Sequence, residues 1–150
     1  MAQSCVTEGI AQVLDTMISL TRLTRQQRVI VAGGDSMALY LGLRQRGFMR
    51  TTTPTLCGHG RAQHAIGFIG GQNAANQGSG AGIEGYLEQI SAFMTVNAGL
   101  ALLVGSGENS LKIRTKLERL GFRVEAGVRC AQGLVLSASR QGYEQVARAA

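Results

Sequence analysis

Residues Leu111–Arg140 read LKIRTKLERLGFRVEAGVRCAQGLVLSASR, and the spacing of their apolar residues changes part-way along. The first part predicts a helix over Glu108–Leu120, whose apolar residues are Leu111, Ile113, Leu117 and Leu120. Gly121 follows, at the position where helices commonly end on glycine. Two β-like runs, Arg123–Arg129 and Gly133–Ser139, come next and are close enough in sequence to pair as an antiparallel hairpin.

Shorter elements precede this stretch, and helices alternate with strands. Strands are predicted where apolar and β-branched residues cluster, at Arg28–Ala32, Ala65–Ile69 and Gly99–Val104, with a Thr-rich edge strand at Arg50–Leu56 that is limited by Pro54. Helices are predicted at Thr7–Leu23 (with Thr7 as N-cap), Ser36–Arg46, Ile83–Met94 and, in the tail, Gly142–Ala150.

The alternation of helices and strands indicates an α/β fold, a sandwich of helices around a mainly parallel sheet. The C-terminal hairpin adds an antiparallel edge to this sheet. We expect one domain over residues 1–150, in which residues 1–27 form a helical lead-in.

The composition of the chain argues against nucleic-acid binding, membrane association and secretion. The net charge of +6 permits attraction to nucleic acid, but the basic residues are scattered, aromatic residues are only 5% and Trp is absent, so nucleic-acid binding is disfavoured. The apolar runs are too short to span a bilayer, and the first residues, MAQSCVTEGI, do not resemble a secretory signal. Three widely spaced cysteines favour reduced thiols, so we expect a cytoplasmic protein that does not bind membranes.

The order of elements resembles the Rossmann-like class I S-adenosylmethionine (SAM)-dependent methyltransferases. Gly85–Val104 is similar to the helix, turn and fifth strand of that family, and Asn97-Ala98-Gly99 stands near its usual Pro-Gly-Gly. Leu111–Arg140, with the segment LERLGFRVE, is similar to its last helix and final two strands. The resemblance covers Arg28 to Arg140, with one strand–helix unit of the family pattern expected to be missing from the middle.

The resemblance implies SAM as cofactor and gives its binding residues. The family's first motif, an acid followed by a Gly-x-Gly turn, corresponds to Gly33-Gly34-Asp35-Ser36, and the turn after the Ala65–Ile69 strand corresponds to Gly70-Gly71. No alignment of the glycines puts an acid at the family's position. Asp35 either substitutes for it from one turn later or caps the helix that begins at Ser36, and we favour the cap.

A long stretch without carboxylates covers the region where the family holds the ribose. Between Asp35 and Glu84 the sequence has no acidic residue, although the ribose hydroxyls and the sulfonium of SAM suit carboxylates. An acid-free site with His59, Arg61 and His64 instead suits an anion or no ligand, and Asn73 offers a neutral hydrogen-bonding group to a substrate.

Two further motifs are weak. Gly80–Gly85 matches the G-x-G-x-x-G dinucleotide pattern, but the preceding predicted strand ends about ten residues earlier. Cys57 and His59, with His64, resemble part of a metal site that lacks an evident fourth ligand, so no metal is expected.

Three functions stay open on this evidence. The favoured one is a methyltransferase-like domain with a degenerate SAM site and a binding or assembly role. The second is an active small-molecule methyltransferase with a non-standard cofactor motif, and the third is a phosphate- or nucleotide-binding module. We also expect a homo-oligomer, because a shortened sheet exposes an edge or an apolar face that a second copy could cover.

Overall fold

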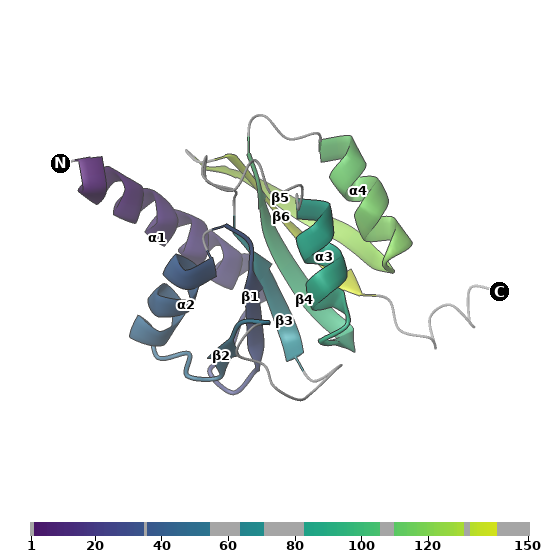
Figure 1. Cartoon of the computed structure of the whole chain (residues 1–150), viewed down its shortest axis with the longest axis horizontal. Helices are drawn as coiled ribbons and strands as arrows, with labels where there is room; N and C mark the ends of the chain where they lie inside the picture. Colours follow the sequence, from purple (N-terminus) through teal and green to yellow (C-terminus); the bar gives the residue numbers. More distant parts are fainter. Residues whose placement is uncertain are drawn as a thin grey trace.

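A computed structural model of the chain describes residues 2–34, 36–54, 64–70, 83–105, 110–130 and 133–140, with side chains from residue 9 onward. The elements in chain order are α1 (Ala2–Thr21), β1 (Val29–Ala32), α2 (Ser36–Gln45), β2 (Thr51–Thr52), β3 (His64–Ile69), α3 (Ile83–Ser91), β4 (Met94–Val104), α4 (Ser110–Arg119), β5 (Phe122–Cys130) and β6 (Gly133–Arg140). Figure 1 shows α1 and α2 together on one side of the sheet, with α3 and α4 together on the other.

The strands of these residues form one six-stranded sheet in the order β2-β1-β3-β4-β6-β5. The pairs β2–β1, β1–β3 and β3–β4 are parallel, whereas β4–β6 and β5–β6 are antiparallel. This arrangement confirms the predicted α/β fold with a mainly parallel sheet and a C-terminal antiparallel hairpin.

Two apolar cores hold the layers together, one on each face of the sheet. The α1/α2 core buries Leu14 and Met17 of α1 and Leu39 and Leu43 of α2 against alternate strand residues such as Phe68. In the other core, α3 and α4 pack against the strand side chains that point to the opposite face of the sheet. The helix residues of this core are Ile83, Leu87, Ile90, Ile113 and Leu117. Because successive strand residues point to opposite faces, both sides of the central strands are buried, as is typical of parallel sheets.

Two predicted boundaries were wrong. Helix α1 begins at Ala2, so Thr7 lies inside it and is not its N-cap. Helix α3 ends at Ser91, and the buried Met94 begins β4 instead of extending the helix. Strand β2 is an edge strand of only two residues, which confirms that Pro54 limits it, since Pro54 cannot donate a ladder hydrogen bond just beyond it.

The Asn97-Ala98-Gly99 segment also differs from the expected turn, because it lies inside β4. The register between β3 and β4 jumps from His64↔Met94 to Ile66↔Gly99, so β4 contains a bulge at this point. Buried Ala98 keeps the bulged segment attached to the core, and the extra residues bring Asn97 to the surface. The predicted tail helix Gly142–Ala150 lies outside the described residues.

The middle of the chain is short, as expected. Strands β2 and β3 lie on either side of β1 and are joined only by residues 53–63. Residues 55–63 of this connection lie outside the described part of the chain, so the expected absence of one strand–helix unit stays a prediction.

Candidate functional site at the carboxyl edge of the sheet

The strand order of the sheet reverses between β1 and β3, which makes this place the topological switch point. From β1 it proceeds through α2 to β2 on one side, whereas β3 and β4 lie on the other side. In open α/β sheets the crevice outside the carboxyl ends of two such strands is the usual ligand site. Ala32 and Ile69 are paired at these ends, and Gly33 and Gly70 follow them directly.

Gly33 and Gly70 touch each other at this edge. Gly33 has a φ of +104°, and a Cβ atom on it would lie 2.6 Å from the carbonyl oxygen of Gly70 and 3.0 Å from its nitrogen. The Gly70 N–H donates a hydrogen bond to the carbonyl oxygen of Ala32, 2.9 Å away, which fixes this approach. The packing of the two strand ends therefore requires a glycine at position 33 whether or not a ligand binds.

The turn after β1 directs the N-terminus of α2 toward the same edge. The Ser36 N–H donates to the carbonyl oxygen of Gly33 at 3.2 Å, and Ser36 is the first residue of α2. Backbone N–H groups at a helix start attract carboxylates and phosphates. Of the residues proposed for the cofactor, the structure thus brings Gly33, Gly34, Ser36 and Gly70 to one edge.

The other predicted site residues fall outside the described part of the chain. These residues are Asp35, His59, Arg61, Gly71 and Asn73. Beyond β2 the described chain continues with Thr53, which is buried, and Pro54, which is half-buried. Among the described residues that directly follow β1, β2 and β3, none is acidic.

His64 lies at the opposite, amino edge of the sheet, as the first residue of β3. It therefore lies away from the carboxyl edge, and the prediction that grouped it with the anion-binding residues His59 and Arg61 of the cofactor region was wrong. Its side chain is buried, and its backbone N–H donates to the carbonyl oxygen of Phe93 at 2.9 Å. Burial lowers the pKa of the imidazole below its ordinary value of 6.5, and the nearby Arg28 charge lowers this pKa further. Within the described ranges, no three His, Cys, Asp or Glu side chains come together to hold a metal ion.

We expect the stability of the protein to fall on acidification because of His64. The folded state disfavours the protonated imidazole, so its contribution to the free energy of unfolding is complete above pH 6.5 and is lost as the pH falls through the lower folded pKa. His64→Phe should therefore reduce the decrease in stability between about pH 8 and about pH 5, measured by urea unfolding at several pH values. Identical pH profiles of the variant and the wild type would contradict this assignment.

The fold of this chain is similar to the folds of several solved methyltransferase structures. The chain matches the 1,6-didemethyltoxoflavin-N1-methyltransferase of Burkholderia thailandensis, solved with bound 1,6-didemethyltoxoflavin and S-adenosylhomocysteine, at 14% identity and a TM-score of 0.57, over 93% of this chain and 82% of that one. It matches the precorrin-6y C5,15-methyltransferase of Geobacter metallireducens at 15% identity and a TM-score of 0.59, over 87% and 88% of the two chains. The fold is that of a class I SAM-dependent methyltransferase.

A third solved structure with a similar fold is a tRNA methyltransferase. The tRNA (m1A58) methyltransferase TrmI of Aquifex aeolicus matches at 13% identity and a TM-score of 0.59, over 87% of this chain and 68% of that one. No protein-family model matches the sequence, and no curated protein is significantly similar to it. At these identities the likeness establishes the fold of the methyltransferase-like chain and not its substrate.

A second group of polar residues gathers at the amino edge of the sheet, and sequence reasoning missed it. A hollow there is lined by Arg22, Gln27, Asn97 and Glu125, among others. These residues come from distant parts of the sequence, so no local motif indicates the hollow.

None of the described helices is long and apolar enough to cross a membrane.

Proposed function

We propose that this chain is a methyltransferase-like domain whose SAM site is degenerate, and that it acts by binding or assembly. The observation that carries the proposal is the contact between Gly33 and Gly70. The space beside Gly33 is filled by the Gly70 backbone, so strand packing alone explains why position 33 is a glycine. The described residues that directly follow β1, β2 and β3 also lack the carboxylates that would suit the SAM ribose.

The whole chain, residues 1–150, is proposed to act as one cytoplasmic domain, with residues 1–27 as its helical lead-in. Support comes from the packing of α1, since its side chains Val13, Leu14 and Met17 belong to the α1/α2 core. Removing α1 would uncover this core.

The proposal predicts that SAM binds weakly or not at all. Titration calorimetry of the folded protein with SAM and with S-adenosylhomocysteine should give no heat at millimolar ligand. Micromolar binding would overturn the degenerate site and favour the active small-molecule methyltransferase, with Gly33, Gly34, Asp35 and Ser36 holding the methionine end and Gly70 and Gly71 beside the transfer.

The start of α2 is the reason to keep a second alternative, a phosphate- or nucleotide-binding module. Helix α2 begins at Ser36, directly beyond the carboxyl end of β1, and a helix start at this place in an α/β sheet suits phosphate. Titration with inorganic phosphate and with ADP tests the phosphate-binding alternative. Binding that weakens as salt rises and is lost in Arg61→Ala would favour it over the degenerate methyltransferase.

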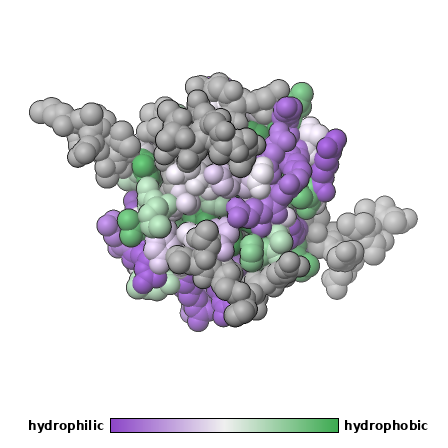
Figure 2. All heavy atoms as spheres, viewed as in Figure 1, coloured by the Kyte–Doolittle hydropathy of each residue, from purple (hydrophilic) through white to green (hydrophobic). Residues whose placement is uncertain are grey.

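Assembly is proposed to use the outer surface of α2. Met37 and Leu41 are one helical turn apart on α2 and are 56% and 52% exposed, and Met49 just beyond the helix is 58% exposed. In Figure 2 hydrophobic atoms, drawn in green, lie on the left of the molecule, where Figure 1 shows α1 and α2. Exposed large apolar side chains that lie together are typical of interaction surfaces, and here a second copy of the chain is the proposed partner.

Leu41→Glu tests this homodimer. The substitution places a charge in the centre of the proposed contact and should convert a dimer to a monomer in light scattering coupled to size-exclusion chromatography. The matched control is Leu111→Glu, because Leu111 is 71% exposed on α4, on the other face of the sheet. A monomeric wild type, or a dimer that only Leu111→Glu disrupts, would contradict the α2 interface.

A further inference from the structure

The hollow at the amino edge of the sheet has the volume of a small-molecule site and a largely polar wall. It has a volume of about 640 Å³, within the range of ligand pockets. Its lining comes from the end of α1, the start of β3, the bulge of β4, the bulge of β5 and the end of β6. This edge lies at the opposite ends of the parallel strands from the candidate cofactor site, so the hollow is independent of the proposed function.

Two β-bulges border this one hollow. The bulge of β4 presents Asn97, and the bulge of β5, at the register shift between Val124 and Ala126, presents Glu125. Bulges redirect side chains and are enriched beside functional sites. The Glu125 carboxylate accepts a hydrogen bond of 2.6 Å from the Ser139 hydroxyl, which holds it at the wall of the hollow.

Arg22 reaches the hollow from a strained backbone position. It follows α1 with a φ of +53°, the left-handed conformation that usually requires glycine or asparagine. The Leu23 N–H donates to the carbonyl oxygen of Ile18 at 3.2 Å, which closes the helix end around it. A glycine would adopt this conformation with less strain, so the arginine side chain stands here at a cost to stability.

The two opposite charges of the hollow are not paired with each other. Arg22 and Glu125 both line it, yet within the described residues neither takes part in an ion pair. The last turn of α1 also lines the hollow, and the C-terminal end of a helix favours a positive charge. The Arg22 guanidinium can bind a carboxylate of a ligand. The Glu125 carboxylate, together with the C-terminal end of α1, can bind an ammonium group of a ligand.

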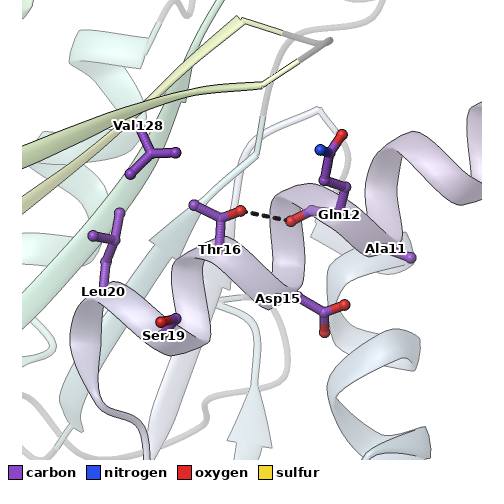
Figure 3. A pocket seen from close by; sticks show the side chains of 7 residues that line it. All are labelled: Ala11, Gln12, Asp15, Thr16, Ser19, Leu20 and Val128. Carbon is purple, nitrogen blue, oxygen red and sulfur yellow. Dashed lines mark hydrogen bonds between the residues drawn. The ribbon is translucent and has the colours of Figure 1, made fainter.

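An apolar groove continues from the hollow along α1. The two share Ser19 and Leu20, and the groove is further lined by Ala11, Gln12, Asp15, Thr16 and Val128. Figure 3 shows Val128 of β5 lying across from Leu20 and Thr16 of α1. Leu20 and Val128 supply apolar contact in this groove, and the charge of Asp15 in its wall is compensated by Arg46 at 3.0 Å.

We propose that this hollow binds the zwitterionic group of a free α-amino acid with an apolar side chain. The α-carboxylate binds Arg22, the α-ammonium binds Glu125 beside the end of α1, and the side chain lies along the groove against Leu20 and Val128. Ser139 and Asn97 supply the remaining hydrogen bonds of the polar group.

The test is titration of the ¹⁵N-labelled full chain with L-leucine, followed by NMR. We expect shifts of the amide signals of Arg22, Asn97 and Glu125 at millimolar L-leucine. N-acetyl-L-leucine, which lacks the ammonium, and L-leucinamide, which lacks the carboxylate, should each bind about tenfold more weakly. Equal shifts with all three ligands, or no shifts at these amides, would overturn the proposal.

Two variants separate binding from folding. Glu125→Gln should weaken L-leucine binding about tenfold, while Arg114→Gln, on the exposed surface of α4, should leave it unchanged. Arg22→Gly should raise the midpoint of urea unfolding and at the same time weaken binding, a combination that misfolding cannot produce. If Arg22→Gly binds L-leucine as well as the wild type, the carboxylate contact is wrong.

Discussion

Replacing Gly33 with alanine is expected to lower the free energy of unfolding by about 3 kcal/mol. Two costs combine at this position. The backbone has a φ of +104°, which disfavours any side chain, and the new Cβ would lie 2.6 Å from the carbonyl oxygen of Gly70. That oxygen is backbone at the end of β3 and cannot move aside without disturbing the pairing of β1 and β3. Urea unfolding followed by circular dichroism measures the loss.

Gly121→Ala is the matched control for this effect. Gly121 has a similar φ of +87°, but nothing lies within 4 Å of its Cβ position. Its substitution should therefore cost only the backbone strain, about 1 kcal/mol. The difference between the two variants is the cost of the collision with Gly70, and equal losses would show that β1 and β3 do not approach as described.

Replacing Phe68 with alanine is expected to cost about 3–5 kcal/mol of stability. Phe68 lies near the carboxyl end of β3 and is 0% exposed, packed in the α1/α2 core. Deleting its ring removes apolar contacts and leaves a cavity that the two neighbouring strands prevent from closing. The measurement is again the free energy of unfolding in urea.

Leu111→Ala provides the comparison for Phe68→Ala. Leu111 is mostly exposed on α4, so its truncation should change the stability by less than about 0.5 kcal/mol. A loss for Phe68→Ala as small as that for Leu111→Ala would mean that the α1/α2 core is not closed around β3.

The fold was predictable because its signals are local. Helix α4, Gly121 and the hairpin of β5 and β6 follow one another within Leu111–Arg140, and each is specified by neighbouring residues. The boundaries that failed depend on tertiary contacts. Met94 continues the apolar spacing of α3, but its place opposite His64 in the sheet makes it the first residue of β4.

The candidate site was less accessible to sequence reasoning. The glycines after β1 and β3 could be placed at one edge, because the carboxyl ends of parallel strands meet there. Their mutual contact could not be foreseen, since it depends on the register Ala32↔Ile69. The hollow around Arg22 and Glu125 joins the end of α1 to a bulge of β5, and no sequence pattern connects such distant positions.

The two edges of the sheet limit how copies of this protein can meet. Strand β5 is an edge strand that carries the exposed charges Arg123, Glu125 and Arg129 and is interrupted by a bulge. Strand β2, at the other edge, offers only two residues to a new partner strand. Charges, bulges and short edge strands all oppose the addition of further strands, so this sheet is protected against edge-to-edge polymerisation into fibrils.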